Sequence, residues 1–317
     1  MRIAILGSGG VGGYFGGRLA ALGTPEVDVS FIARGAHLAA MRERGLRIFS
    51  PAGDVHVPRV SATDDPAAIG PVDIVFFTVK LYDTDEAIKM LPPLLGPRTL
   101  VVPFQNGVDS VDALVRAVGR DHVAGGTAYV AAVISEPGVI RHTAMGRLIF
   151  GAIDKSDGSR PDVLPVLEDL RQACTRAGFD ATLSDRILVD IWAKFARLTV
   201  FSGMTSITRS PIGVVCGDPD LFAMMQAALR ESIAVARGRQ IPLPETLFDE
   251  IVASLSSLPP HAKSSMLEDL ERGRRIEVPW LSGAMARIGR EVGVDTPTHR
   301  LVETLLRPHI NGHPPAQ

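Results

Sequence analysis

The first 34 residues carry the pattern that most constrains how this chain can fold. The apolar run Ile3–Leu6 leads directly into Gly7-Ser8-Gly9-Gly10-Val11-Gly12, and an apolar-periodic stretch separates this turn from a second apolar run, Val27–Ala33. A strand, a G-x-G-x-x-G turn, a helix and a second strand, in this order, form a unit that binds dinucleotides. Gly7 permits the tight turn, Gly9 lets the backbone approach a pyrophosphate, and Gly12 allows helix and strand to pack closely. The sequence therefore predicts a dinucleotide site here, with a glycine-rich turn that binds no ligand as the alternative.

The residue that ends the second strand indicates which dinucleotide is bound. An acid at this position would accept hydrogen bonds from a ribose 2′-hydroxyl. The strand instead ends with Ala33-Arg34-Gly35, and Asp28 lies at its opposite end. The guanidinium of Arg34 suits a 2′-phosphate through its charge and its planar set of donors. We therefore expect NADP(H) as the cofactor, and the alternative role of Arg34 is that of a solvated loop cation.

Length, charge and cysteine content favour a cytoplasmic enzyme. The 317 residues suffice for two domains with separate cores, and the net charge of −2 arises from charges of both signs spread along the chain. We expect no nucleic-acid partner, because no basic block is present. The apolar stretches are too short to span a membrane, and we expect no signal peptide before the first strand. Cys174 and Cys216 form neither a disulfide framework nor a metal-binding pattern, so we expect no metal.

The first half of the chain alternates between strands and helices. Further strands are predicted at 72–79, 99–104, 124–134, 138–142, 148–151 and 180–183, and helices at 84–91, 110–118 and 163–177. This alternation predicts an α/β, Rossmann-type doubly wound parallel sheet. The short connection Glu136-Pro137-Gly138 predicts a hairpin, so that the sheet ends with antiparallel strands.

The pattern changes after residue 184, where helical periodicity replaces strands. Helices are predicted at 185–203, 218–238, 244–256, 264–273, 279–293 and 297–307. We therefore expect a dinucleotide-binding domain over 1–184 and an all-α domain over 185–317. The tail at 311–317 is expected to be disordered.

Lys80 and Asn106 follow two consecutive predicted strands of the sheet. Ligands of open α/β sheets bind outside the carboxyl ends of the strands, where both residues are expected. A lysine there can meet a phosphate or a carboxylate, and an asparagine amide can hold a carboxamide or a hydroxyl. Asn106-Gly107 is also a common turn pair, which is the alternative for Asn106.

Lys194 is the most informative residue of the second half. On a helix over 187–201, it falls inside an apolar stripe formed by Ile187, Ile191, Leu198 and Phe201. The lysine could extend its methylene chain along this stripe and place its ammonium in water. Alternatively, it could lie in a cleft, where desolvation lowers its pKa and allows it to act as a general acid toward a carbonyl oxygen.

Two further polar groups accompany this lysine. Ser265 and Glu268 have the spacing of a capping box at a helix start, although a serine hydroxyl there can also hold a substrate carboxylate. Glu277 lies between apolar residues just before another predicted helix. It is either a partner of that helix dipole or a partner of Lys194.

Taken together, these motifs resemble those of the ketopantoate reductase (2-dehydropantoate 2-reductase) family. The resemblance extends from residue 1 to about residue 305, and Glu277 lies at the family's distance beyond the serine pair. The matching pieces are the glycine turn, Arg34 in Ile32-Ala33-Arg34-Gly35, Lys80 in Thr78-Val79-Lys80, Gln105-Asn106-Gly107, Glu136-Pro137-Gly138, Trp192-Ala193-Lys194 and Ser264-Ser265-Met266-Leu267.

The resemblance implies a Rossmann domain joined to a helical domain like the C-terminal domain of 6-phosphogluconate dehydrogenase, with the active site in the cleft between them. It implies reduction of 2-dehydropantoate to pantoate with NADPH, a step of pantothenate biosynthesis. By resemblance, Lys194 is the general acid, Asn106 contacts cofactor and substrate, and Ser265 contacts the substrate carboxylate. Glu277 is then close to the lysine and the cofactor. Arg34 and Lys80 take the positions of cofactor contacts.

Two positions depart from the family pattern. Family enzymes usually carry asparagines four and eight residues after the lysine, where this chain has Leu198 and Ser202. Leu198 cannot donate a hydrogen bond and Ser202 reaches less far, so the substrate-binding wall is expected to be more apolar. The alternatives are therefore a reductase for another 2-oxo acid or an imine, and a non-catalytic NADPH sensor, which would have no need of Lys194. The apolar helices of the second domain could also bury surface in a homodimer.

Overall fold

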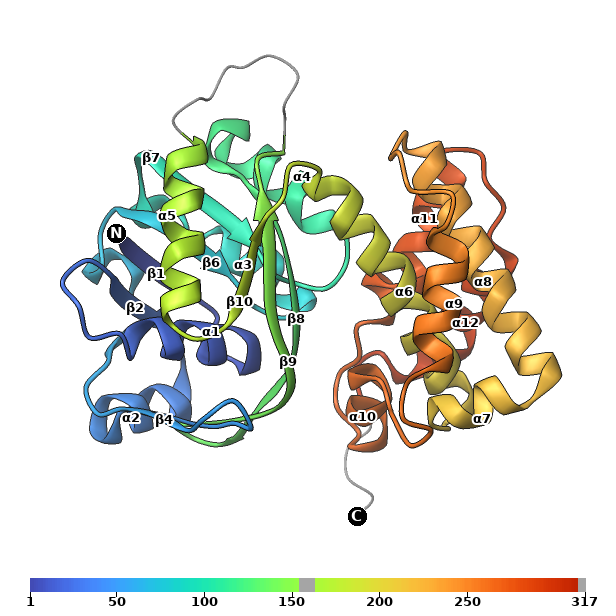
Figure 1. The fold of residues 1–317 in the computed structure, drawn as a ribbon, viewed down its shortest axis with the longest axis horizontal. Helices are drawn as coiled ribbons and strands as arrows, with labels where there is room; N and C mark the ends of the chain where they lie inside the picture. Colours follow the sequence, from blue (N-terminus) through green and yellow to red (C-terminus); the bar gives the residue numbers. More distant parts are fainter. Residues whose placement is uncertain (154–162, 313–317) are drawn as a thin grey trace. The chain divides into compact units, whose positions relative to one another are not determined.

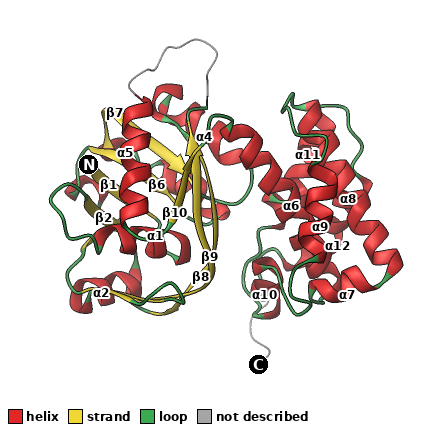
Figure 2. Ribbon diagram, in the orientation of Figure 1, coloured by secondary structure: helices red, strands yellow, loops and turns green. Residues whose placement is uncertain are grey.

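The computed structural model describes residues 1–153 and 163–312, and the chain divides into two compact units. The first unit comprises Met1–Asn106 and Ser110–Asp190, and the second comprises Gly107–Asp109 and Ile191–Gln317. All described strands belong to the first unit, whereas the second is built from helices (Figure 2). Residues 313–317 of the tail for which we expected disorder lie outside the described residues.

The main sheet of the first unit has five parallel strands. Its spatial order is β5 (Ser61–Thr63), β2 (Asp28–Ile32), β1 (Arg2–Leu6), β6 (Val72–Phe77) and β7 (Leu95–Pro103). The three central strands are mostly apolar because most of their residues are buried on both faces, as in other parallel sheets, and the buried Ser30 of β2 is a polar exception. The predicted Rossmann-type sheet is therefore confirmed.

A second sheet contains the strands that we expected to end the main one. Its order is β10 (Asp180–Leu183), β9 (Val139–Gly151), β3 (Leu46–Phe49) and β4 (Val55–Val57), and β8 (Gly125–Glu136) pairs antiparallel with β9. The hairpin at Glu136-Pro137-Gly138 is confirmed, but the prediction that it ends the main sheet is wrong. The segments predicted as separate strands at 138–142 and 148–151 belong to one strand, β9. The sequence indicated two strands because register shifts and the positive φ angles of Met145 and Gly146 interrupt the alternation of side chains along β9.

Helix α1 (Gly10–Ala20) lies between the two sheets and contacts strands of both (Figure 1). Its glycines allow this close approach. A Cβ at Gly16 would lie 2.7 Å from Ile5 in the main sheet, and a Cβ at Gly17 would lie 2.7 Å from Ile48 in the second sheet. The position of the glycine turn that precedes α1 is thus fixed by packing on two sides.

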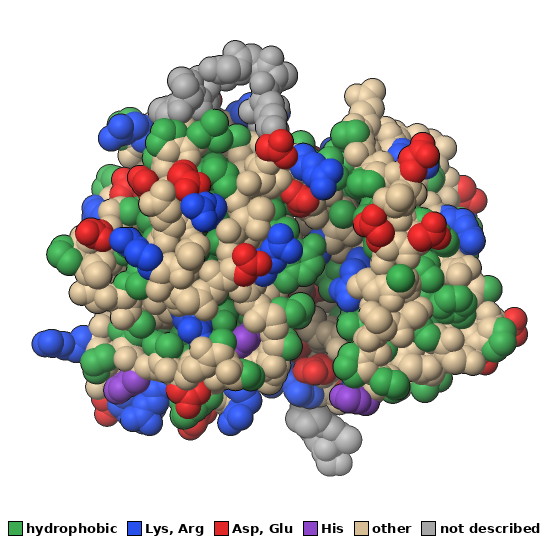
Figure 3. Space-filling view, viewed as in Figure 1, with side chains coloured by type: hydrophobic (Ala, Val, Ile, Leu, Met, Phe, Trp, Pro, Cys, Tyr) green, Lys and Arg blue, Asp and Glu red, His purple; other side chains and the backbone are tan. Residues whose placement is uncertain are grey.

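The remaining helices of the first unit cover its sheets or connect their strands. They are α2 (Gly35–Arg44), α3 (Thr84–Ile88), α4 (Asp109–Val118), which begins at the end of the segment assigned to the second unit, and α5 (Val163–Arg176). Over the face shown in Figure 3, positive and negative side chains are interspersed, as the near-zero net charge suggests.

The second unit is organised around one long helix, α6 (Ile187–Thr208), which begins at the end of the first unit. Buried side chains occur on most sides of α6, as expected for a helix inside a helical core. It is followed by α7 (Ile212–Gly217), α8 (Pro219–Gly238), α9 (Leu247–Ser256), α10 (Ser265–Glu271), α11 (Ser282–Glu291) and α12 (Pro297–Leu306). Among the described residues, no helix has the length and hydropathy required to cross a membrane.

Candidate active site

Four groups of predicted cofactor residues follow four adjacent strands of the main sheet. In spatial order, Arg34 follows β2, the glycine turn follows β1, Lys80 follows β6 and Asn106 follows β7. The strands are parallel, so all four groups lie in one row beyond the carboxyl ends of the strands. We call this row of residues the cofactor edge.

The glycine turn of the cofactor edge has space for a ligand on one side only. Gly7 has a φ of 102°, and a Cβ there would lie 2.6 Å from the Val79 nitrogen. A Cβ at Gly10 would lie 2.0 Å from the Ala132 carbonyl oxygen, whereas a Cβ at Gly9 would meet no atom within 4 Å. Helix α1 begins directly after Gly9 and carries no acidic residue in its first turn. These features fit a phosphate group bound by backbone N–H groups at a helix N-terminus.

Two side chains hold the glycine turn against its neighbours. The buried Ser8 hydroxyl donates to the Ile32 carbonyl oxygen at 3.0 Å, which ties the turn to β2. The Thr78 hydroxyl donates to the Gly7 carbonyl oxygen at 2.8 Å, which ties the turn to the end of β6. The Ser8 side chain is therefore committed to the protein itself, and its contribution to a ligand would come from the backbone.

Arg34 is exposed at the tip of β2, as expected for a residue that meets a ligand. Within the described residues, no carboxylate pairs with it. One acid near this tip escaped the sequence prediction: Asp64 follows β5, the strand beside β2, and pairs with Arg42 at 3.6 Å. We missed it because β5 contains only Ser-Ala-Thr and gives no hydrophobic signal.

Lys80 and Asn106 flank the connections that leave β6 and β7. Lys80 is exposed immediately before the short 3-10 helix η2 (Leu81–Asp83), and Asn106 is half-buried. Gly107 has a φ of 96°, and residues 105–108 form a bend in the backbone. This bend leaves open the binding role predicted for the Asn106 side chain.

In the second unit, Lys194 and Glu277 form an electrostatic pair. Lys194 is half-buried on α6, and Glu277 is 7% exposed just before the 3-10 helix η5 (Val278–Trp280). Burial lowers the pKa of the Lys194 ammonium to about 8; the Glu277 carboxylate opposes this effect, and the Arg197 guanidinium adds to it. An ammonium with this pKa can donate a proton near neutral pH.

The α6 residues after Lys194 differ in exposure. Leu198 and Phe201 are half-buried and continue its side of the helix, whereas Ser202 is 1% exposed. The Ser202 hydroxyl has no hydrogen-bond partner among the described residues. Leu198 thus presents hydrocarbon beside the lysine, while the buried Ser202 hydroxyl is able to donate or accept a hydrogen bond.

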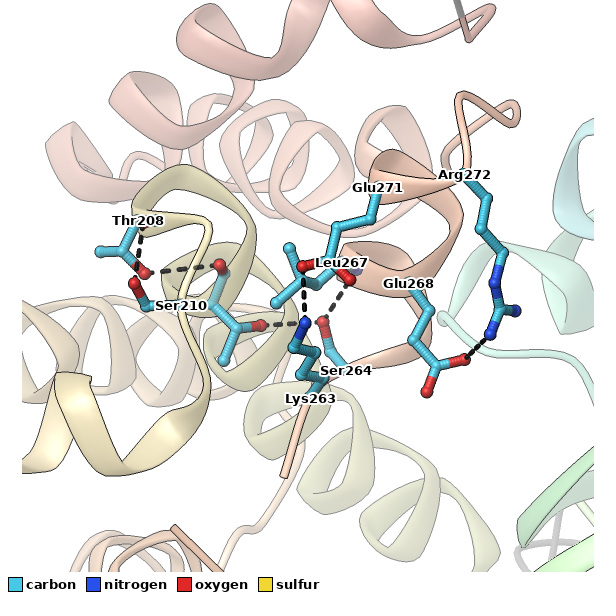
Figure 4. Close-up of polar contacts among 9 residues, drawn as sticks. Thr208, Ser210, Lys263, Ser264, Leu267, Glu268, Glu271 and Arg272 are labelled. Atoms are coloured by element: carbon cyan, nitrogen blue, oxygen red, sulfur yellow. Dashed lines mark hydrogen bonds and ion pairs between the residues drawn. The ribbon is translucent and has the colours of Figure 1, made fainter. Parts of the chain in front are cut away.

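The two serines at the start of α10 have different roles from those predicted, and Figure 4 shows the contacts of Ser264, the N-cap. Ser264 caps the helix, because its hydroxyl accepts a hydrogen bond from the Leu267 N–H at 3.1 Å. The capping box predicted for Ser265 and Glu268 is therefore wrong, and Glu268 pairs with Arg272 at 3.4 Å instead. The error arose because either serine could be the cap by sequence. Ser265 is exposed and its side chain is not needed for capping.

Comparison with known proteins identifies the family. The family model described as ketopantoate reductase PanE/ApbA matches residues 3–155, and its C-terminal counterpart matches residues 186–309. The 2-dehydropantoate 2-reductase of Mesorhizobium japonicum is 31% identical over 97% of each chain. The crystal structure of a PanE/ApbA family ketopantoate reductase from Ralstonia eutropha has a TM-score of 0.85 and 32% identity over 98% of each chain.

The chain belongs to the ketopantoate reductase family. It is accordingly an oxidoreductase, and the family indicates a nicotinamide cofactor. A D-mandelate dehydrogenase solved with NADH and anilino(oxo)acetate also superimposes, with a TM-score of 0.85 over 98% of each chain. At 21% identity, this likeness shows the shared fold alone.

One residue of this ketopantoate reductase family member was not among those predicted from the sequence. Thr205 is buried on α6, and its hydroxyl lies 2.8 Å from that of Ser264 and donates to the Phe201 carbonyl oxygen at 2.7 Å. The pair fastens the start of α10, and hence the Ser265 backbone, to the helix that carries Lys194. Its position about three turns after Lys194, on the same side of α6, was the only available indication.

Proposed function

We propose that this chain reduces 2-dehydropantoate to pantoate with NADPH, in the biosynthesis of pantothenate. The observation that carries the proposal is Lys194, an ammonium whose pKa is lowered to about 8 beside the buried carboxylate of Glu277. A lysine that only extended along an apolar stripe would keep its ammonium in water and its ordinary pKa. The family to which the chain belongs supplies the substrate class.

The choice of NADPH is supported by the cofactor edge. Arg34 is the cation at the tip of β2, and Asp64, an acid at the end of the neighbouring strand β5, is already paired with Arg42. A guanidinium can bind a 2′-phosphate with two donors, which a ribose hydroxyl does not require. The open side of Gly9 leaves space for the pyrophosphate.

The chemistry divides between the cofactor and the residues of this chain. When bound, a nicotinamide cofactor supplies the hydride that reduces the ketone carbon. We propose that Lys194 donates a proton to the ketone oxygen as negative charge develops there, and that Glu277 keeps this lysine protonated. Asn106 orients the carbonyl group and the nicotinamide through its amide, and Ser265 holds the substrate carboxylate.

The test is NADPH oxidation measured with 2-dehydropantoate and with a panel of simpler 2-oxo acids. We expect turnover of 2-dehydropantoate and NADPH binding in the absence of substrate. NADPH binding without turnover of any 2-oxo acid or imine would contradict the proposal and favour a sensor. A second candidate function, reduction of a more apolar 2-oxo acid, is favoured by Leu198, which offers hydrocarbon where family enzymes usually carry an asparagine.

The expected homodimer stays a prediction. Leu301 and Leu305, one turn apart on α12, are 47% and 53% exposed, which is consistent with a surface that another copy could cover. Size-exclusion chromatography with light scattering would decide it, and a monomeric mass at micromolar concentration would contradict it.

A further inference from the structure

Gln105 lies between the end of β7 and Asn106. Its side chain forms hydrogen bonds with residues of three separate chain segments. Its amide nitrogen donates to the Val79 carbonyl oxygen at 2.8 Å and to the Thr84 hydroxyl at 3.0 Å. Its amide oxygen accepts a hydrogen bond from the Ser110 hydroxyl at 2.7 Å. The residue is 8% exposed, so these bonds are shielded from water.

The orientation of this amide follows from its partners. A backbone carbonyl can only accept a hydrogen bond, so the nitrogen of Gln105 must face Val79. Both amide hydrogens are then used, and the oxygen is left to face Ser110. A buried amide with its donors and its acceptor satisfied is costly to replace, because each partner would lose its bond without gaining one from water.

The backbone pairing of β6 with β7 ends just before these residues. The last paired residues of the two strands are Phe77 and Pro103, and one further bond joins the Phe104 nitrogen to the Phe77 carbonyl oxygen at 3.0 Å. Beyond that bond, the Gln105 side chain continues the connection between the two chain segments by binding Val79. It therefore fixes the segment that precedes Lys80 relative to the segment that contains Asn106.

The same segment is also held to the glycine turn. Thr78 donates to the Gly7 carbonyl oxygen at 2.8 Å, and Gly7 packs so closely on Val79 that a Cβ would lie 2.6 Å from the Val79 nitrogen. A displacement of Val79 would therefore affect three parts of the cofactor edge: the glycine turn, Lys80 and Asn106.

We propose that Gln105 is a positioning residue for cofactor binding, which acts by holding Lys80 and Asn106 at a fixed separation. The inference rests on the proposed function, because the cofactor roles of those two residues are part of it. Gln105 does not itself act on the substrate. Its effect is transmitted through the Val79 carbonyl and through the backbone that it shares with Asn106.

Thr99 provides a matched control for a purely structural role. It is 1% exposed at the middle of β7, donates to the carbonyl oxygen of Val72, the first residue of β6, and accepts a hydrogen bond from the Gly96 nitrogen at 2.8 Å. Thr99 therefore links β7 to β6 with buried hydrogen bonds, as Gln105 does, but away from the cofactor edge.

The experiment compares Gln105→Met with Thr99→Val by thermal unfolding and by the Kd for NADPH in the absence of substrate. Both variants should lower Tm. Gln105→Met should raise the Kd by about tenfold, the factor that corresponds to 1.4 kcal/mol, while Thr99→Val should stay within about twofold. Equal changes in Kd for equal losses of Tm would overturn the proposal, since the effect would then be one of stability.

A double-mutant cycle tests whether Gln105 acts through its neighbours. If it does, Gln105→Met should weaken NADPH binding less in a Lys80→Ala or Asn106→Ala background than in the unmodified chain. Additive effects in both backgrounds would overturn the positioning role. Because Kd is measured without substrate, a chain that binds NADPH but does not reduce 2-dehydropantoate would refute the proposed function and leave this result standing.

Discussion

The cofactor edge and the Lys194 side of α6 are built in different ways. At the cofactor edge, the backbone decides where each group lies: parallel strands end in one row, and Gly7 and Gly10 are excluded from carrying side chains by atoms less than 3 Å away. On α6, the backbone is a regular helix, and side chains alone distinguish Lys194 from Leu198. Few substitutions at the cofactor edge would leave its backbone geometry intact, whereas single substitutions on α6 can change the chemistry beside Lys194 without altering the helix. Substrate choice should therefore depend on a few residues of α6.

Removal of the Lys194 ammonium should have the largest effect of any single change. Lys194→Ala should lower kcat by roughly 10²- to 10⁴-fold, the range for loss of a proton donor, with little change in the Kd for NADPH. Steady-state kinetics and cofactor titration measure the two quantities. Lys89→Ala, which removes an exposed lysine paired with Glu86, is the control and should keep full turnover. A near-normal kcat in Lys194→Ala would show that this lysine only packs against its neighbours and does not donate the proton.

Cofactor preference tests the other side of the comparison. The unmodified chain should bind NADPH at least tenfold more tightly than NADH, about 1.4 kcal/mol, and Arg34→Asp should invert or abolish the preference. Asp64→Ala should strengthen it, because a negative charge at the end of β5, the strand beside β2, is removed. Calorimetric titration with both cofactors gives the ratios. Equal affinities in the unmodified chain would show that the cofactor edge does not discriminate.

The pH profile links the lowered pKa of Lys194 to its role. Reduction needs the protonated ammonium, so kcat should be constant below pH 8 and fall by about tenfold per pH unit above it. Oxidation of the hydroxy acid needs the neutral amine, so its rate should rise through the same pKa. In Glu277→Gln, both curves should move to lower pH, because the carboxylate that raises the lysine pKa is gone. Unchanged pH profiles in Glu277→Gln would show that the Glu277 carboxylate does not influence the pKa of Lys194.

The smallest expected effect concerns Leu198 and Ser202. Asparagine at both positions should raise the activity on 2-dehydropantoate relative to its analogue without the 4-hydroxyl by roughly two- to tenfold, since one hydrogen bond contributes about 0.5–1.5 kcal/mol. The measurement is the ratio of kcat/KM for the two substrates before and after the substitutions. If the unmodified chain already strongly favours 2-dehydropantoate, the apolar wall does not set the preference.

Prediction from sequence succeeded where local pattern and structure coincide. Strands β1, β2 and β6 are mostly apolar because most of their residues are buried on both faces, so the main sheet and its turn could be inferred from residues near one another in the chain. The second sheet could not, because β3 and β4 are short and the membership of the β8–β9 hairpin depends on contacts distant in sequence. Asp64 was missed for the same reason: it lies near the tip of β2 only because β5 pairs with β2, and this pairing joins residues distant in sequence.

The candidate site shows this limit at the scale of single residues. The sequence placed Lys194 among apolar residues, but it left open whether Glu277, distant along the chain, would be a partner of this lysine or of a helix dipole. It offered two adjacent serines before α10 and could not decide which one caps the helix. The hydroxyl of Thr205, which joins α6 to that cap, is indistinguishable in sequence from any buried threonine. Pairings of this kind depend on tertiary structure and are not encoded in a local pattern.

The glycines of α1 have a consequence for residues remote from the cofactor edge. Gly16 and Gly17 bring the helix axis close to Ile5 on one side and to Ile48 on the other, so a shift of the helix toward either sheet would meet these side chains. Enlarging a side chain of the second sheet beneath α1 therefore displaces the helix along with its first turn. The second sheet carries none of the predicted site residues, but it thus determines where the backbone N–H groups of that turn lie relative to a bound phosphate.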